Sequence, residues 1–489
     1  MTDHQVLYVG GEWVRPAGQE RLTVRSASTE AIIGSVPAAS AADADAAVRA
    51  ARAVCTDPGG WSAWPPARRA DVLDRFADEL DRRAEDIITA ICRQNGMPLA
   101  IARQIEAGSA ARLLRYYARL IRELPIEETR PGLLVKETLV RRRPIGVVAA
   151  ILPWNVPQTL MFAKVAPALA AGCPIIVKPS PETVLDAYLV AEAAEAAGIP
   201  RGVLSILPGG RELGAYLVSH PEVDRVAFTG STEGGRAVAE ACARLLRPVS
   251  LELGGKSAAI VLDDADLEPG EVRADLFAAT LANSGQVCFL GTRVLAPRSR
   301  YAEVVELFEQ ILKSAPVGDP LDERTLIGPM VSARQRDRVQ GYIEAGRADG
   351  ARVVVGGDRV SGPGWFVQPT LFADVDNSAR IAQEEIFGPV LSVIPYDADD
   401  DAVRIANDSQ YGLGGTVWSG DPERALAVAS RVQTGTIGIN GYAPEPTAPF
   451  GGVKASGIGR EYGPEGLASY QQLQSVYFPA GRPTPAGGR

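Results

Sequence analysis

From residue 147 to residue 253, short apolar runs alternate with longer alanine-rich segments in which apolar positions recur at helical spacing. This alternation predicts a parallel sheet with helices on both faces. The apolar runs agree with that prediction, because strands of a parallel sheet are buried on both sides. Strands are expected at 147–152, 174–177, 203–207, 225–228 and 249–253, and helices at 160–171, 184–197, 212–219 and 233–246.

A second alternating block covers about residues 258–438 and predicts a second α/β domain. Its strands are expected at 258–262, 293–296, 352–355, 390–395, 415–418 and 436–439. Its helices are expected at 301–313, 332–348 and 422–432.

The remaining segments surround these two blocks. Before the first block we expect a hairpin at 6–14, a helix at 43–54 and two or three long helices between 66 and 124. An extended hairpin at 133–143 and a strand at 472–478 lie outside both blocks. Such strands need an edge to pair with, and a partner subunit commonly supplies one.

Length and composition narrow the class of protein. A chain of 489 residues exceeds one hydrophobic core, so two or three domains are expected. The chain has 50 Lys and Arg against 59 Asp and Glu, a net charge of −9, which argues against a nucleic-acid-binding or anionic-membrane surface. No apolar run reaches the ~18 residues of a membrane helix, and the start of the chain lacks a secretory signal. We expect a cytoplasmic protein without nucleic-acid or membrane partners.

The cysteines and histidines exclude other chemistry. The five cysteines, at 55, 92, 173, 242 and 288, are scattered and include no C-x-x-C pair. This argues against a disulfide framework and against zinc, so no metal is expected. The two histidines are His4, near the terminus, and His220, in a Ser-His-Pro turn where a solvated imidazole is expected. The partner base of a reactive thiol is therefore expected to be a carboxylate.

Cys288 is the candidate nucleophile. It ends the run Asn-Ser-Gly-Gln-Val-Cys at 283–288, and Glu252 opens a Glu-Leu-Gly-Gly-Lys turn upstream. A thiol attacks strongly once it is ionised, so a cysteine with a carboxylate base predicts covalent catalysis through a sulfur-bound intermediate. Asn155, after the first strand of the sheet, could donate its amide N–H to an oxyanion beside Cys288. Taken alone, Asn155 is more simply an ordinary turn residue.

Two further features lie at the carboxyl ends of predicted strands, where ligands of parallel sheets bind. Lys178 ends one strand, and a loop containing Gly230 and Ser231 follows another strand and opens a helix. Glycine lets backbone N–H groups approach a phosphate, and the helix N-terminus adds partial positive charge. The spacing Gly-x-x-x-Gly-Gly differs from the usual dinucleotide fingerprint, so Ser231 is equally explained as an ordinary helix cap.

Together these stretches resemble the NAD(P)-dependent aldehyde dehydrogenase superfamily over nearly the whole chain. Each stretch is short, but their joint order and spacing are highly specific. The matching stretches are Pro-Trp-Asn at 153–155, Lys-Pro-Ser at 178–180, Phe-Thr-Gly-Ser at 228–231, Glu-Leu-Gly-Gly-Lys at 252–256, Gly-Gln-Val-Cys at 285–288, Glu-Glu-Ile-Phe-Gly-Pro at 384–389, Pro-Phe-Gly-Gly at 449–452, Ser-Gly at 456–457 and Gly-Arg-Glu at 459–461.

The resemblance implies roles for individual residues. Cys288 would be the nucleophile, Glu252 the general base, and Asn155 an oxyanion-hole donor beside the backbone N–H of Cys288. In binding NAD, Lys178 would hold the adenosine ribose, Ser231 the pyrophosphate and Glu385 the nicotinamide ribose. Further cofactor-binding positions implied by the resemblance are Trp154, Ser180, Gly230, Leu253 and Phe387.

The resemblance also implies the architecture. A doubly wound, Rossmann-like cofactor domain would comprise residues 1–125 and 144–252, and a second, catalytic α/β domain residues 253–455. A small β oligomerisation arm and the C-terminal segment would comprise 126–143 and 456–489. Relatives are dimers or tetramers, so a homodimer or homotetramer is expected.

Two departures from the family pattern bear on cofactor and substrate. NAD-preferring relatives often carry Glu three residues after the ribose-binding Lys; here Pro181 is at that position and Glu182 follows, so NAD is expected and NADP stays possible. Many relatives have Trp where this chain has Ala163, which would widen the aldehyde tunnel if that side chain lines it. Other expected lining residues are mostly apolar and favour a medium or bulky hydrophobic aldehyde: Val156, Thr159, Leu160, Phe289 and Tyr442.

The implied activity is oxidation of an aldehyde to its carboxylic acid through a cysteine thiohemiacetal and thioester, which Glu-activated water hydrolyses. A CoA-acylating aldehyde dehydrogenase stays open as an alternative, although such enzymes commonly lack the base that Glu252 would supply. A non-catalytic binding protein with the same fold is the second alternative, because a fold alone does not prove activity.

Overall fold

A computed structural model describes residues 2–268 and 270–482 of the chain. Its first sheet has eight strands in the order β20-β12-β11-β8-β9-β10-β2-β3. The five central strands are parallel, and edge strands β2, β3 and β20 add antiparallel pairs. The central strands are β8 (Val148–Ile151), β9 (Ile175–Lys178), β10 (Leu204–Ile206), β11 (Arg225–Thr229) and β12 (Val249–Glu252), and the edge strands are β2 (Leu7–Val9), β3 (Glu12–Val14) and β20 (Gly457–Ile458).

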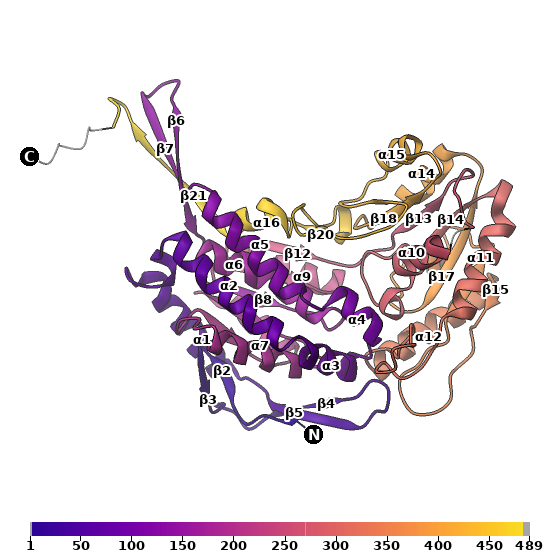
Figure 1. Ribbon diagram of the computed structural model, residues 1–489, viewed down its shortest axis with the longest axis horizontal. Coiled ribbons are helices and arrows are strands. Elements are labelled where there is room, and N and C mark those ends of the chain that lie inside the picture. Colours follow the sequence, from indigo (N-terminus) through magenta and orange to yellow (C-terminus); the bar gives the residue numbers. More distant parts are fainter. Residues whose placement is uncertain (1, 269, 483–489) are drawn as a thin grey trace, which may run out of the picture.

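Helices cover both faces of this sheet, as the alternating pattern predicts (Figure 1). One layer contains α6 (Pro157–Ala171) and α7 (Leu185–Ala196), and α2, α3 and α5 pack outside it. The other layer contains α1 (Ala41–Thr56), α8 (Arg211–Ser219) and α9 (Thr232–Arg244). The predicted doubly wound arrangement is confirmed.

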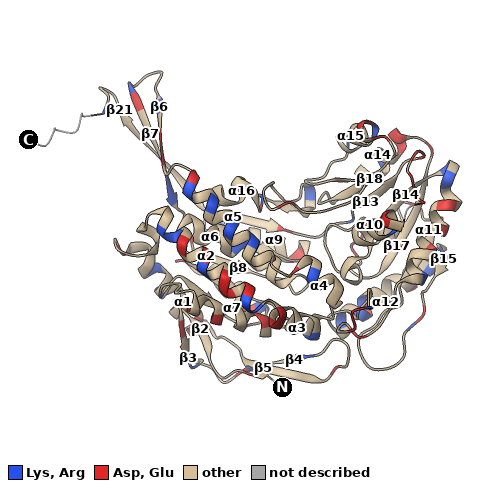
Figure 2. Cartoon of the chain, in the orientation of Figure 1, with Lys and Arg blue, Asp and Glu red and all other residues tan. Residues whose placement is uncertain are grey.

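Four helices occupy residues 66–123 where two or three were expected. They are α2 (Pro66–Arg82), α3 (Ala84–Asn95), α4 (Leu99–Ile105) and α5 (Ser109–Glu123). The extra breaks occur at glycines in the left-handed region, Gly96 (φ 81°) after α3 and Gly108 (φ 66°) before α5. Acidic and basic side chains both occur along α2, whereas the charged side chains of α5 are mainly arginines (Figure 2). Arg115 of α5 pairs with Asp78 and Asp81 of α2.

The second sheet has seven strands in the order β15-β16-β17-β14-β13-β18-β19, all parallel except β15. Its strands are β13 (Ala258–Val261), β14 (Arg293–Pro297), β15 (Arg352–Val355), β16 (Thr370–Ala373), β17 (Val390–Tyr396), β18 (Gly415–Trp418) and β19 (Gly438–Ile439). Its helices are α10 (Gly270–Thr280), α11 (Tyr301–Ser314), α12 (Ala333–Ala348), α13 (Arg380–Gln383), α14 (Asp399–Asn407) and α15 (Pro422–Ala429). The sequence pattern missed β16, α10, α13 and α14.

A three-stranded sheet, β21-β7-β6, projects from the body of the molecule (Figure 1). The hairpin consists of β6 (Glu127–Pro131) and β7 (Glu137–Pro144), so the expected range of 133–143 contained only the turn and the second strand. The late strand, β21 (Gln471–Phe478), is present as predicted, and it pairs with β7 of the same chain. The proposed domain boundaries remain a prediction, and β20 shows that the first sheet also takes a strand from beyond residue 455.

The remaining elements are small. A sheet in the order β1-β5-β4 contains β1 (Thr2–Asp3), β5 (Ile32–Pro37) and β4 (Arg21–Arg25), and α16 (Gly463–Ala468) precedes β21. Within residues 2–268 and 270–482, no helix has both the length and the apolar character needed to cross a membrane.

Candidate active site

Four neighbouring parallel strands, in the order β12-β11-β8-β9, end at one edge of the first sheet. Glu252 ends β12, the loop with Gly230 and Ser231 follows β11, Asn155 comes shortly after β8, and Lys178 ends β9. The sheet register therefore collects four of the sequence-predicted positions at the edge where ligands of parallel sheets bind.

The segment before Cys288 has an unusual backbone. Asn283, Ser284 and Gly285 have consecutive positive φ values of 51°, 57° and 75°. The left-handed conformation is costly for a serine, and buried hydrogen bonds hold it, because Ser284 Oγ donates to the Gly328 carbonyl at 3.0 Å and accepts from the Gly328 N–H at 2.9 Å. A Cβ on Gly285 would lie 2.1 Å from the carbonyl oxygen of Gly388, so this position requires glycine.

The Gly-Gly pair after β12 lets two chain segments meet at Cys288. A Cβ on Gly255 would lie 2.3 Å from the Cys288 carbonyl oxygen, and one on Gly254 would lie 2.5 Å from Glu385 Oε2. The Gly255 N–H donates to Glu385 Oε1 at 2.9 Å. A larger residue at either position would push the segment after β12 away from Cys288 and Glu385. The two glycines therefore allow the candidate base, Glu252, to lie near the candidate nucleophile and the candidate ribose-binding carboxylate.

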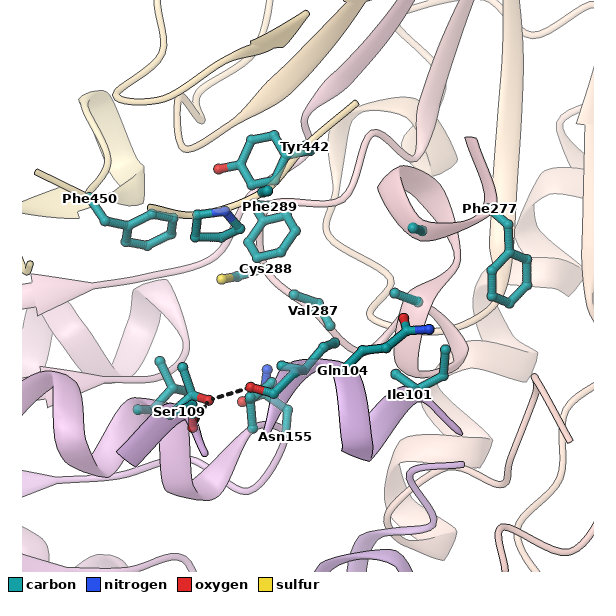
Figure 3. A pocket seen from close by; sticks show the side chains of 18 of the residues that line it. Ile101, Gln104, Ser109, Asn155, Phe277, Val287, Cys288, Phe289, Tyr442 and Phe450 are labelled. Atoms are coloured by element: carbon teal, nitrogen blue, oxygen red, sulfur yellow. Dashed lines mark hydrogen bonds between the residues drawn. The ribbon is translucent and has the colours of Figure 1, made fainter. Parts of the chain in front are cut away.

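A cavity of about 660 Å³ opens beside Cys288. Figure 3 shows the sulfur pointing into the space between Phe450 and Phe289 on one side and Asn155 and Ser109 on the other. All the expected tunnel residues line this cavity: Val156, Thr159, Leu160, Phe289 and Tyr442. Ala163 does not line it, because that side chain is buried in the hydrophobic core beneath the cavity. The condition under which Ala163 was expected to widen the tunnel is therefore not met.

Asn155 is fixed by a set of buried amides. Its side-chain N–H donates to the Gln286 carbonyl at 3.0 Å. Its own carbonyl accepts from Asn95 Nδ2 at 3.2 Å and from Asn283 Nδ2 at 3.1 Å. Asn155 and Cys288 both line the cavity, so the structure holds an amide donor and a thiol at the same wall.

Glu252 lies in a buried and electrostatically crowded position. Neither carboxylate oxygen has a hydrogen-bond partner among the described residues, and a Cβ on Gly451 would lie 2.9 Å from Glu252 Oε1. Burial raises the pKa of Glu252 well above its usual value, and the negative charge of Glu461 raises it further. Burial likewise raises the pKa of the Cys288 thiol, with Glu385 and Glu252 adding to the effect.

An ion pair beside Glu252 was not predicted as part of the site. Lys164 Nζ lies 2.6 Å from Glu461 Oε1 and donates to Thr229 Oγ1 at 2.7 Å. Lys164 lowers the pKa of Glu252, opposing the effect of Glu461. The signal in the sequence was a lysine inside an otherwise apolar helix, since the other positions of 160–171 carry no charge. A second missed group is Lys256, whose buried ammonium has no partner among the described residues and whose pKa burial lowers to about 7.

The crevice at the end of β9 has the donors and acceptors of a nucleotide site. Lys178 Nζ donates to the carbonyls of Pro179 and Gly209, each at 2.8 Å, and burial lowers its pKa to about 8. Ser180 Oγ donates to Glu182 at 2.5 Å. The negative charge of Glu182 opposes this lowering of the Lys178 pKa, so the carboxylate acts on the lysine although it is one position later than in the family pattern.

Of the other predicted cofactor positions, Ser231, Gly230, Leu253 and Trp154 follow strands of the first sheet, whereas Glu385 and Phe387 come from the segment between α13 and β17. Ser231 caps α9 and accepts from the Gly234 N–H at 3.2 Å, and the Gly230 N–H donates to the Glu252 carbonyl at 3.0 Å. Leu253 packs against Gly235, where a Cβ would lie 2.4 Å from its side chain. The rings of Trp154 and Phe387 meet edge to face, 5.3 Å apart. Burial raises the pKa of Glu385 to about 6.

Two other residue groups can be placed. His220 is not solvated as expected, because its side chain is 11% exposed and lies 3.3 Å from Asp45, and it does not line the Cys288 cavity. Among the described residues, no group of three or more His, Cys, Asp or Glu side chains is arranged to hold a metal ion.

The fold brings a thiol, a carboxylate and a strand-end crevice together, as the sequence motifs indicate for an enzyme site. Comparison with known proteins then identifies the family. The profile of the aldehyde dehydrogenase family matches residues 13–476. The chain therefore belongs to the aldehyde dehydrogenase family, and the expected family and enzyme class are confirmed.

Individual relatives cover almost the whole chain. Geranial dehydrogenase from Castellaniella defragrans is 56% identical over 477 residues, covering 97% of this chain and 99% of the relative. An aldehyde dehydrogenase from Mycobacterium tuberculosis, solved with NAD⁺, is 46% identical with a TM-score of 0.95 and coverage of 99% and 100%. A mutant of aldehyde dehydrogenase C from Pseudomonas syringae, solved with NAD⁺ and octanal, is 41% identical with a TM-score of 0.92 and coverage of 97% and 96%.

Proposed function

We propose that this protein oxidises a bulky hydrophobic aldehyde of the terpenoid type to the carboxylic acid, with NAD as the hydride acceptor. The observation that carries the proposal is the position of Cys288, which borders a large cavity on one side and the strand-end crevice of the first sheet on the other. The walls nearest the thiol are aromatic and aliphatic, so they favour a hydrophobic substrate. The 56% identity to a geranial dehydrogenase supports the same substrate class.

Cys288 would act as the nucleophile. Its thiolate attacks the aldehyde carbon and forms a C–S bond, and the carbonyl π electrons move to oxygen to give a thiohemiacetal oxyanion. Asn155 and the backbone N–H of Cys288 would donate to that oxyanion, and one such donor is worth about 3–4 kcal/mol in the transition state. The amides of Asn95 and Asn283 hold Asn155 at the cavity wall, which supports this assignment.

The crevice residues fit a dinucleotide. Lys178 and Glu182 offer a donor and an acceptor for ribose hydroxyls, Ser231 begins a helix whose N-terminus favours a phosphate, and Glu385 lies beside Cys288. We also assign cofactor contacts to Trp154, Ser180, Gly230, Leu253 and Phe387. The chemistry that NAD supplies when bound is acceptance of a hydride from the carbon attached to sulfur. The carboxylate of Glu182 would repel a 2′-phosphate, so we favour NAD over NADP.

Glu252 would act as the general base in hydrolysis of the thioester. It takes a proton from water as the water oxygen attacks the acyl carbon, and Cys288 leaves as thiolate. Its raised pKa makes it a stronger base than an ordinary carboxylate once it is ionised. The presence of this carboxylate favours hydrolysis over transfer to CoA.

The test is reduction of NAD followed at 340 nm with geranial, octanal and propanal, each with and without CoA. We expect geranial to have the highest kcat/KM, formation of the free acid, and no acceleration by CoA. We expect the KM for NADP to be higher than the KM for NAD. Acyl-CoA as the product would assign the CoA-acylating activity instead, and failure to reduce either cofactor would support the non-catalytic alternative.

We further propose that the β21-β7-β6 sheet is an oligomerisation arm and that the protein forms a homodimer or homotetramer. Support comes from apolar side chains on this projecting sheet, of which Leu473 is 67% and Tyr477 65% exposed. Exposed apolar groups on a projection of this kind mark contact surfaces.

A further inference from the structure

The cavity beside Cys288 has two regions with different walls. Near the sulfur it is aromatic, since the rings of Phe289 and Tyr442 stack at 4.4 Å and Phe450 and Tyr462 close the same side. Away from the sulfur the wall contains mostly small and aliphatic side chains, together with the ring of Phe277 and the polar side chains of Gln104 and Arg273. Figure 3 shows Phe277 and Ile101 far from Phe450, with Cys288 and Val287 between them. We call the region between Val287 and Phe277 the outer gallery.

Alanines on one side keep the outer gallery wide. Ala274, Ala278 and Ala282 recur every four residues along α10 and the turn after it, so they occupy one helical face, and all three line the cavity. Ala315, just after α11, lines it as well. A larger side chain at any of these positions would reduce the volume of the cavity.

The gallery opens to solvent. Gln104, Arg273 and Ser314 line its outer end and are exposed, and they belong to α4, α10 and α11.

The volume of the cavity exceeds what a ten-carbon aldehyde needs. Such a molecule has about eleven non-hydrogen atoms, which at roughly 20 Å³ each fill about a third of the space. A fifteen-carbon aldehyde fills about half of it by the same reckoning. A short ligand that ends before the outer gallery would leave the alanine wall in contact with water. A longer tail would cover that apolar surface and remove it from water.

From these features we infer that the outer gallery is a subsite for the tail of isoprenoid aldehydes longer than ten carbons, and that a fifteen-carbon isoprenoid aldehyde is the better substrate. The inference rests on the proposed function, because it assumes that Cys288 attacks the aldehyde carbon. It adds that Ala274 and Ala278 determine the accepted chain length, although neither lies near the sulfur.

The experiment compares kcat/KM for geranial and farnesal, which have ten and fifteen carbons, in the wild type and in three variants. We expect farnesal to exceed geranial by at least about fivefold in the wild type, because its extra carbons are buried against the gallery wall. Ala278→Trp and Ala274→Trp should each lower kcat/KM for farnesal about tenfold or more and change that for geranial less than about twofold. Ala278 and Ala274 are exposed, so either indole can be accommodated without repacking the core.

The matched control is Ala302→Trp, at an exposed position of α11 that does not line the cavity. It should leave both substrates unchanged. Geranial oxidised well with farnesal a poorer substrate would overturn the inference and leave the proposed function standing, as would Trp variants that slow both substrates equally. A wild type that oxidises neither aldehyde, nor any other, overturns the proposed function and the inference with it.

Discussion

The ammonium of Lys164 lies 2.6 Å from a carboxylate oxygen of Glu461, and their side chains are 0% and 5% exposed. This pair sits beside Glu252, whose pKa the negative charge of Glu461 raises and the positive charge of Lys164 lowers. Two charges of opposite sign therefore shift the pKa of the proposed base in opposite directions. Removing either one should move the pH at which Glu252 becomes able to accept a proton.

Glu461→Gln removes the negative charge while keeping the shape of the side chain. The pKa of Glu252 should fall, because Glu461 no longer raises it, and the acidic limb of the kcat–pH profile should move to lower pH. Unfolding should become easier by about 3–5 kcal/mol, because Lys164 is left buried without its partner.

The double variant Glu461→Gln/Lys164→Met is the matched control. It removes both charges, so the acidic limb should return towards its wild-type position and part of the lost stability should be recovered. An acidic limb that stays fixed in both variants would mean that Glu252 does not control the pH dependence.

Glu252→Gln should increase thermal stability in a pH-dependent way. Burial raises the folded-state pKa of Glu252 above the unfolded value of about 4.3, so in wild type the folded chain holds a proton that the unfolded chain loses. Stability therefore falls as pH rises from the unfolded to the folded pKa. The Gln variant lacks this loss, so its advantage in Tm should be absent near pH 4 and reach about 1–3 °C at pH 9. Calorimetric scans across this range test the sign, and a variant that loses stability at alkaline pH would contradict it.

The same variant should accumulate the covalent intermediate. Glu252→Gln leaves Cys288 able to attack but slows hydrolysis, so a burst of NADH equal to the enzyme concentration should precede slow turnover. Mass spectrometry of the quenched enzyme should find the acyl group on Cys288. Cys288→Ala should lose both the burst and at least about 10⁴-fold in kcat. A burst followed by normal steady-state turnover would remove Glu252 from the role of base.

Asn155→Ala should lower kcat about 10²–10³-fold with a small change in KM, because an oxyanion donor acts mainly in the transition state. Asn95→Ala tests the support beneath it, since Asn95 Nδ2 donates to the carbonyls of both Trp154 and Asn155. Loss of that support should lower kcat about tenfold through misplacement of the donor. Gln104 lines the same cavity but makes no hydrogen bond to Asn155. The control variant Gln104→Ala should therefore leave kcat unchanged. Equal effects of the Asn95 and Gln104 variants would argue against a positioning role.

Much of this arrangement could be predicted from the sequence because it follows from local pattern. Continuous apolar runs placed all five central strands of the first sheet, and the sheet register then collected Asn155, Lys178, Ser231 and Glu252 at one edge. The short stretches around Cys288 and Glu252 are among those that indicate the family from sequence alone. These features depend on residues close together in the chain.

The sequence pattern did not predict the features that depend on contacts between residues far apart in the chain. Lys164 and Glu461 are 297 positions apart, so only folding makes them a pair. Helix α10 lacks a clear apolar stripe because several of its residues line the cavity or face solvent, as Ala274 and Ala278 do. Whether Ala163 lines the cavity could not be read from the sequence, and its side chain packs into the core. The sequence indicated that β21 needs an edge to pair with, but only folding shows that the hairpin strand β7 supplies it along the whole length of β21.

The exposed apolar side chains on β21 give the last prediction. Leu473 and Tyr477 are four residues apart in a strand, so they lie on the same face, and a monomer would leave both in water. The double variant Leu473→Asp/Tyr477→Asp should therefore shift the protein to smaller species and raise the dissociation constant about 100-fold or more, as measured by sedimentation. Gln474→Asp, on the opposite face of β21, adds one charge without removing an apolar contact and should leave the assembly intact. Because no residue of β6, β7 or β21 lines the Cys288 cavity, the dissociated variant should retain the aldehyde specificity of the wild type. A wild type that sediments as a monomer would show that these side chains serve no contact between copies.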